Sequence, residues 1–423
     1  MRNTLIALVY LSCLARAASA ADDAPKFELR DGDRVVLIGS TFIEREQAHG
    51  YLETLLMSRY PDRHITFRNL GWSGDTVFGE ARARFGSPAD GFQHLKEHVE
   101  ALRPTVILVC YGMNESFDGS AGLQRFGDGL GKLLDMLAAT KARVVLISPN
   151  RHEDMGRPFP DPTAHNQYLR LYGDVLREAA TERGYGFVDL FDLLGDGTRD
   201  NPPHRLTDNG IHLTAYGYWR AAAAIERGLG LDQPQWLIEF GPDGLPTKWQ
   251  GTSVSDTVRG ADGVRFTVTD ERLPVPPAPA GAPPTVKDRS RTMRIGGLKP
   301  GDYAIRIGDR VLAKFRAGDE PAVVHLTTGP EFDQVQELRR AVIAKNQLYF
   351  HRWRPQNETY LFGFRKHEQG QNAAEVPKFD PLVEVQESRI AKLRSPASHV
   401  YRIGPQDGAA EGASLDNAST GAK

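Results

Sequence analysis

Four short motifs in the first half of the chain bring together side chains that can attack, donate hydrogen bonds or move a proton. A hydroxyl group can act as a nucleophile, a backbone N–H or an amide can stabilise developing negative charge, and histidine can carry a proton near neutral pH. The motifs are rich in Gly, Ser, Thr, Asn, Asp and His, and they cover residues 35–44, 69–76, 111–116 and 207–217. Together they indicate one site built from distant parts of the chain.

Alternating strand and helix patterns over residues 31–231 predict the elements that position these motifs. Short β-branched runs predict strands at 34–39, 64–69, 105–111, 143–148 and 186–191. Apolar residues spaced three and four apart predict helices at 50–59, 92–102, 123–139, 163–183 and 215–229. This alternation favours an α/β domain in which helices cover both faces of a parallel sheet. The first three motifs then follow strands, at the carboxyl edge where such sheets bind ligands.

In this order, the four motifs resemble those of the SGNH or GDSL family of esterases and acetylhydrolases. The resemblance covers about residues 31–231 and implies a flavodoxin-like fold, a three-layer α/β sandwich, and cleavage of a carboxylic ester. It implies that the backbone N–H of Gly74 and the side-chain amide of Asn114 hold the oxyanion, together with the N–H of residue 41. It also implies that His212 is the catalytic base.

Two positions depart from the family pattern, and both belong to its catalytic triad. The nucleophilic Ser of the family corresponds to Thr41 here, and Ser40 stands at the family's Asp position. The triad Asp of the family lies three residues before His212, where this chain has Asn209, with Asp208 one residue earlier. The catalytic candidates therefore include unusual residue types at the nucleophile and at the carboxylate.

These departures leave several alternatives open for the chemistry. A Thr hydroxyl can attack, but its methyl group stiffens χ1 and crowds the approach. An Asn can orient the histidine through its carbonyl oxygen but supplies no negative charge. Asp208 could take the carboxylate role, Ser40 could be the nucleophile, or His212 could work without an anionic partner. Alternatively, Asp208 and Asn209 only cap the turn before the last helix.

The function expected from the resemblance is hydrolysis of a short acyl ester carried by a carbohydrate, with no cofactor. The expected partner is thus a small-molecule or glycan ester. The alternative is a carbohydrate-binding or scaffold protein that keeps the oxyanion pocket without turnover. An Asp208 carboxylate within hydrogen-bond reach of His212 would favour the enzyme, and one turned to solvent would favour the binding protein.

The second half of the chain follows a different pattern. Short alternating runs over 236–328, including a hairpin around Gly308 and Asp309, predict a small antiparallel β module in the form of a sandwich. The Pro-rich stretch 273–284 within it is expected to be an exposed loop. Residues 331–403 are expected to form a helical extension, with helices at 331–350 and 383–393, and residues 404–423 a disordered tail. The polar and aromatic segment 352–370 is expected to pack as a strap on the α/β domain, or else to close the cleft. The candidate helpers for that closure are His351, Glu358, His367 and Glu368.

Composition and the N-terminus limit the classes of function. The first twenty residues combine Arg2, an apolar run and a small-residue site ending at Ala20, which predicts a signal peptide over residues 1–20 and export. A net charge of −2 argues against nucleic acid as a partner, and no membrane span is expected in the mature chain. The mature chain keeps one cysteine, Cys110, in an apolar strand, and histidines without metal-ligand spacing. The oligomeric state stays open.

Overall fold

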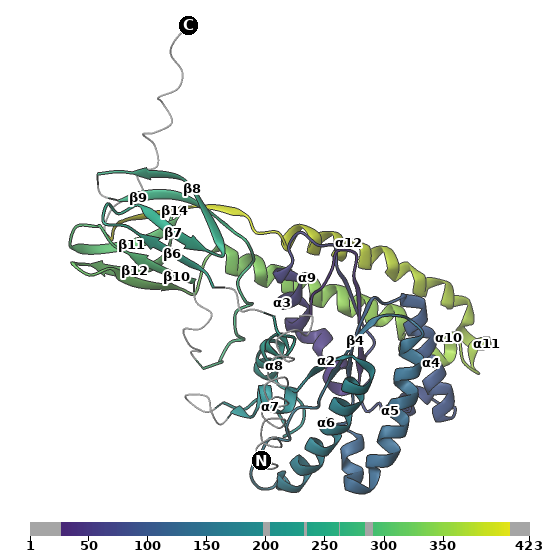
Figure 1. The fold of residues 1–423 in the computed structure, drawn as a ribbon. Helices are drawn as coiled ribbons and strands as arrows, with labels where there is room; N and C mark the ends of the chain where they lie inside the picture. The colour runs from purple at the N-terminus through teal and green to yellow at the C-terminus, as the bar shows by residue number, and fades with distance from the viewer. Residues whose placement is uncertain (1–26, 198–203, 232–234, 262, 284–290, 407–423) are drawn as a thin grey trace, which may run out of the picture.

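A computed structural model describes residues 27–197, 204–231, 235–261, 263–283 and 291–406 of the 423-residue chain. Figure 1 shows an α/β domain, a β module beside it, and two long helices, α9 and α12, that run from the β module along the α/β domain. The expected signal peptide and most of the expected tail lie outside the described residues.

The α/β domain is built on a parallel sheet with the strand order β2-β1-β3-β4-β5. This confirms the predicted fold class of a parallel sheet flanked by helices. The first predicted strand has the observed bounds, and the others are shorter by one to three residues. The strands are β1 (Arg34–Gly39), β2 (Thr66–Asn69), β3 (Val106–Cys110), β4 (Arg143–Ile147) and β5 (Gly186–Val188).

Helices cover both faces of this sheet. The helix Thr41–His49 was not predicted, because only Ile43 and Glu46 of its nine residues are buried and the apolar pattern is therefore weak. Gly50, in the left-handed conformation at φ 63°, separates it from the next helix. The helical elements are α2 (Thr41–His49), α3 (Tyr51–Arg59), η1 (Glu80–Ala83), α4 (Pro88–Leu102), η2 (Glu115–Gly122), α5 (Leu123–Ala138), α6 (Thr163–Arg183), α7 (Leu190–Leu194) and α8 (Ala215–Gly228).

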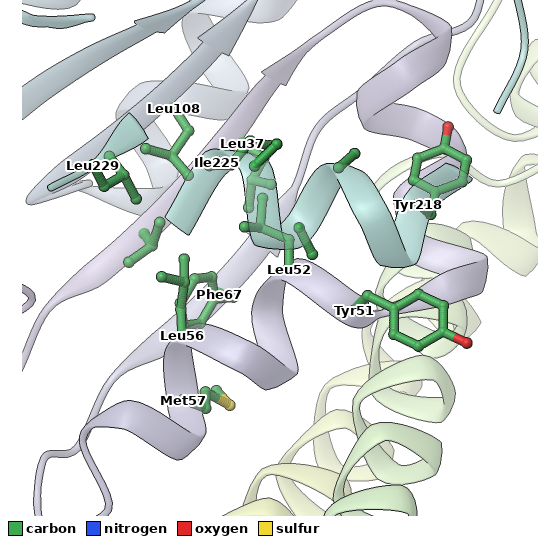
Figure 2. Close-up of a cluster of buried hydrophobic side chains, with 14 of the residues drawn as sticks. Leu37, Tyr51, Leu52, Leu56, Met57, Phe67, Leu108, Tyr218, Ile225 and Leu229 are labelled. Atoms are coloured by element: carbon green, nitrogen blue, oxygen red, sulfur yellow. The ribbon is translucent and has the colours of Figure 1, made fainter. Parts of the chain in front are cut away.

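The strands bury alternate residues in two clusters, one on each face of the sheet. Leu37 and Leu108 point to the face covered by α3 and α8, where they meet Leu52, Leu56 and Ile225 (Figure 2). The neighbouring strand residues pack on the other face against α4, α5 and α6. The sheet is therefore buried on both sides, which holds its carboxyl edge in a fixed position.

The C-terminal helices are part of this packing. Helix α9 (Pro330–Trp353) places Val335, Leu338 and Val342 in the same cluster as the α/β domain, and α12 (Phe379–Leu393) packs along α9. Lys345 of α9 is fully buried and pairs with Glu53 of α3 at 2.7 Å. In the chain between α9 and α12 lie α10 (Glu358–Leu361), α11 (Lys366–Gln369) and η5 (Gly370–Lys378).

The β module contains two sheets that enclose a core of their own. Their strand orders are β13-β10-β6-β7 and β12-β11-β14-β9-β8. The strands are β6 (Leu237–Phe240), β7 (Pro246–Gln250), β8 (Thr252–Arg259), β9 (Val264–Asp270), β10 (Arg291–Ile295), β11 (Gly301–Ile307), β12 (Arg310–Ala317), β13 (Ala322–Leu326) and β14 (Ser398–Pro405).

Strand β14 differs from the expectation for the end of the chain. Residues 398–403 were expected in the helical extension and a tail was expected from Gly404, but β14 lies between β11 and β9 in the second sheet. Tyr401 and Ile403, at alternate positions, are buried in the core of the module. Strand β14 is an interior strand of its sheet, and both of its partners are distant in the sequence. The residues next to it in the chain therefore gave no sign of its pairing.

The Pro-rich stretch also differs from the expected exposed loop. Leu273 is buried in the α/β cluster, and the carbonyl oxygen of Pro276 accepts a hydrogen bond from Trp219 Nε1 of α8 at 2.8 Å. Proline lacks an N–H but keeps its carbonyl and its apolar ring, so the stretch packs without joining a sheet.

Every helix among the described residues is too short or too polar to cross a membrane.

Candidate active site

A small pocket opens at the carboxyl ends of β1 and β3 and has a volume of about 30 Å³. It brings together four of the residues predicted from the sequence, Ser40, Thr41, Asn114 and His212. Its other lining residues are Phe42, Cys110, Tyr111, Met113, Pro149, Asn150, Ile211, Leu213 and Tyr218. The motifs after the first and third strands and before the last helix thus meet at one place.

Thr41 is the first residue of α2, and its hydroxyl faces the loop after β2. Thr41 Oγ1 accepts a hydrogen bond from the Gly74 backbone N–H at 3.2 Å. Gly39, two residues before Thr41, has no room for a side chain, because a Cβ there would lie 2.3 Å from the Cys110 carbonyl oxygen. This close contact between β1 and β3 fixes where α2 starts. Ser40 is buried, with 4% of its surface exposed.

His212 is held by Asn209 rather than by a carboxylate. Asn209 Oδ1 accepts hydrogen bonds from the backbone N–H groups of Ile211 and His212, at 3.2 and 2.9 Å. The amide nitrogen of Asn209 therefore lies 3.0 Å from His212 Nδ1. Because an amide nitrogen only donates, the bonding network assigns Nδ1 as the acceptor and places the ring proton of neutral His212 on Nε2.

The Asp208 carboxylate pairs with Arg45, whereas the described partner of the His212 ring is Asn209, so Asp208 does not hold the histidine. Its side chain is 56% exposed and lies 3.8 Å from Arg45 in a surface ion pair. Burial lowers the pKa of His212, and the positive charge of Arg45 lowers it further, whereas Asp208 raises it. His212 is therefore neutral at pH 7.

Asn114 lines the pocket, but one of its amide hydrogens is already bonded. Asn114 Nδ2 donates to the Asp75 carbonyl oxygen at 2.7 Å. An amide nitrogen carries two hydrogens, so one remains that can donate to a ligand. The predicted oxyanion donor is thus tied to the loop that carries the other donor, Gly74.

Buried charges fix the loop that contains Gly74. Asp75 is fully buried, accepts from Arg82 Nε at 2.5 Å and from the Tyr111 hydroxyl at 2.9 Å. Glu115 accepts the backbone N–H groups of Val77 and Gly112, both at 2.9 Å, and burial raises its pKa to about 7. Sequence reasoning missed these supports, because the sequence does not show that residues 75–82 and 111–115 bond to one another.

The candidate helpers in the C-terminal segment do not line the pocket. Glu358 forms an ion pair with Arg84 and lies 4.0 Å from His94, and His367 and Glu368 lie beside each other on the surface. His351 contacts Phe379 of α12. Their proposed role in closing the cleft has no support in these contacts.

Two other sequence expectations concern thiols and metals. Cys110 is buried, and burial raises the pKa of its thiol to about 12, so it remains protonated. Among the described residues, no three His, Cys, Asp or Glu side chains gather as a metal site would require.

Comparison with known proteins assigns the α/β domain. Residues 39–220 match the model of the GDSL-like lipase/acylhydrolase family. No curated protein matches the sequence.

Solved structures resemble the chain at low sequence identity. BT4096, a gut microbial diltiazem-metabolizing enzyme, matches with a TM-score of 0.70 and 16% identity over 89% of this chain and 98% of that one. The likeness shows that a fold similar to most of this chain occurs in another solved structure. Axe2, an acetylxylan esterase from Geobacillus stearothermophilus, matches with a TM-score of 0.40 and 19% identity over 49% of this chain and 98% of that one. Residues 39–220 form a domain of the GDSL-like lipase/acylhydrolase family.

Proposed function

We propose that this protein hydrolyses carboxylic esters that carry a short acyl group, with Thr41 as the nucleophile. The observation that carries the proposal is that Thr41 Oγ1 lies at a hydrogen-bond distance from the Gly74 N–H, in a pocket that His212 also lines. The Thr41 oxygen attacks the ester carbonyl carbon, and its proton passes to His212 Nε2. His212 then returns the proton to the departing alcohol, and water releases the acyl group by the same route.

The oxyanion that forms during attack needs donors on one side of the carbonyl carbon. Gly74 supplies a backbone N–H, and Asn114 supplies its remaining amide hydrogen. Such donors contribute by about 10²–10³-fold each when they are already in position. The hydrogen bond from Asn114 to the Asp75 carbonyl oxygen ties Asn114 to the loop that carries Gly74, so the two donors keep a fixed position relative to each other.

The tautomer of His212 makes this a slow esterase. To accept the Thr41 proton, Nε2 must be free, and Nδ1 must then carry the ring proton toward the amide nitrogen of Asn209, where two donors would meet. Replacing the triad Asp of a serine protease by Asn, which selects this wrong tautomer, lowers turnover by about 10⁴-fold. We therefore expect turnover far below that of an Asp-containing triad.

The pocket volume limits the acyl group. A pocket of about 30 Å³ is small, which favours an acetyl group over a longer acyl chain. We propose that the alcohol half, which lies outside this pocket, belongs to a carbohydrate, and that the protein acts after export.

A second candidate function is favoured by the position of Asp208. Its carboxylate is exposed and paired with Arg45, so among the described residues no carboxylate forms a hydrogen bond with the His212 ring. A pocket with oxyanion donors and a weak base would bind an acetylated glycan without cleaving it. This alternative shares the ligand class but predicts no turnover.

The test compares hydrolysis of 4-nitrophenyl acetate and butyrate by the purified protein, Thr41→Ala and His212→Ala. We expect faster hydrolysis of the acetate and loss of activity in both variants. Loss in His212→Ala alone would move the nucleophile to Ser40 or water. Activity no higher than in His212→Ala, together with calorimetric binding of an acetylated oligosaccharide, would establish the binding protein instead.

A further inference from the structure

A cluster of side chains next to the pocket joins three distant parts of the chain. Glu44 lies one turn after Thr41 in α2, Ser73 precedes Gly74 in the loop after β2, and Arg354 directly follows α9 as its C-cap. The Glu44 carboxylate accepts the Ser73 backbone N–H at 2.8 Å and the Ser73 hydroxyl at 2.7 Å. Arg354 Nη1 binds the same carboxylate at 2.6 Å. We refer to Glu44, Ser73 and Arg354 as the clamp.

The loop that the clamp holds lies directly on the first turn of α2. A Cβ at Gly71 would lie 2.2 Å from the Glu44 backbone nitrogen, so only glycine allows this approach. Asn69 Nδ2 donates to the Ile43 carbonyl oxygen at 2.6 Å and its Oδ1 accepts the Gly71 N–H at 2.8 Å. The two bonds from Ser73 to Glu44 are the last of these ties before Gly74. The direction of the Gly74 N–H therefore depends on where Glu44 holds Ser73.

Arg354 is fixed in place by an aromatic surface as well as by charge. Its guanidinium lies over the Trp72 ring, 3.5 Å from the ring centroid, and the side chains of Arg354 and Glu44 are 25% and 18% exposed. The preceding Trp353 packs edge-on against Trp72, with the ring centroids 5.9 Å apart. A carboxylate that is largely removed from water needs a partner of opposite charge. Arg354 supplies that charge from the C-terminal extension.

We propose that the C-terminal extension serves the active site through Arg354, a positioning residue that fixes Glu44 and, through Ser73, aims the Gly74 N–H at the oxyanion. The kinetic part of this proposal rests on the proposed esterase function. An oxyanion donor stabilises the transition state only at the right distance, and a displacement of about 1 Å can cost about 10²-fold in rate. Loss of the clamp should therefore lower kcat and leave substrate binding nearly unchanged.

The kinetic test compares Arg354→Met and Arg354→Lys with a matched control, Arg352→Met. Arg352 lies two residues earlier on α9 and pairs with Asp380 at 2.8 Å on the surface, without contact to Glu44. We expect Arg354→Met to lower kcat for 4-nitrophenyl acetate by about 10–100-fold, with KM changed by less than about threefold. Arg354→Lys, which keeps the charge, should restore much of the loss. Equal kcat in Arg354→Met and Arg352→Met would overturn the proposal.

A second measurement does not depend on esterase activity. Amide hydrogen exchange at Ser73 and Gly74 reports the clamp directly, because the Ser73 N–H is bonded to Glu44. We expect exchange about tenfold faster or more in Arg354→Met and Glu44→Gln than in Arg352→Met. If the wild type hydrolyses no ester, the proposed function fails, but this readout still decides on the clamp. Unchanged exchange in both variants would refute it, and Arg354→Lys and Glu44→Gln carry the test if Arg354→Met does not fold.

Discussion

Asn209→Asp is expected to increase ester hydrolysis, because it reverses the tautomer of His212. In the wild type, Asn209 Oδ1 is occupied by two backbone N–H groups, and the amide nitrogen therefore faces His212 Nδ1 at 3.0 Å. An aspartate can accept the same backbone N–H groups with one oxygen and accept a hydrogen bond from the Nδ1–H of His212 with the other. His212 Nε2 then becomes a free base that can accept the Thr41 proton.

The size of the gain follows from the reverse substitution in serine proteases. Exchanging Asp for Asn in that triad costs about 10⁴-fold in turnover, or about 5.5 kcal/mol at about 1.36 kcal/mol for each tenfold change in rate. Thr41 keeps its methyl group and can limit attack once the base is restored. We therefore expect kcat/KM for 4-nitrophenyl acetate to rise by about 10²–10⁴-fold in Asn209→Asp.

The pH profile gives a second readout of the same change. Burial and Arg45 lower the pKa of His212 in the wild type, so activity should already be on its plateau at pH 7 and fall only in more acidic solution. A carboxylate at residue 209 stabilises the protonated ring, so the acidic limb should move to higher pH. If a folded Asn209→Asp protein is no more active than the wild type, or if its acidic limb does not move, the assignment of the His212 tautomer is wrong.

Three further predictions test the nucleophile, a buried ion pair and a buried carboxyl group. Thr41→Ser removes the methyl group but keeps the hydroxyl, so kcat should rise, whereas Thr41→Ala should reduce hydrolysis to background in the same assay. Lys345→Met leaves the carboxylate of Glu53 buried without its partner, so chemical denaturation should show a loss of about 3–5 kcal/mol in the free energy of unfolding. Burial raises the pKa of Glu46 from 4.5 to about 8. The folded state thus binds this proton more tightly than the unfolded state, and the stability that it contributes below about pH 4.5 is lost as the pH rises toward 8. Glu46→Gln should therefore raise the melting temperature relative to the wild type more at pH 8 than at pH 5.

The sequence predicted the α/β domain well because its signals are local. Five apolar β-branched runs became the five strands, and the helix at 163–183 has the observed bounds. Helix α2 was missed because its exposed residues hide the pattern, and β14 was missed because its partners β9 and β11 lie more than 90 residues away in the sequence. Alternating buried residues can mark a strand, but the sequence of one strand does not show which distant strands it pairs with.

The sequence also showed which residues form the site better than it showed which hydrogen bonds those residues make. Thr41, Asn114 and His212 line one pocket, and Gly74 and Asn209 are each bonded to one of them. What the residue types could not show is where each hydrogen points. Arg354 could not be found from the motifs either, because it lies 310 residues after Glu44 and acts through a neighbour of Gly74.

The role of Asn209 shows why capping and catalysis are not separate explanations at this position. Asn209 Oδ1 caps the turn by accepting the N–H groups of Ile211 and His212, as a residue with only a structural role would. That capping fixes the amide plane, and the fixed plane then turns a donor toward His212 Nδ1. An aspartate would cap the turn equally well while accepting from Nδ1, so capping alone does not require an asparagine. The choice of amide over carboxylate therefore acts on the position of the His212 ring proton, and we propose that this tautomer lowers the turnover of the site.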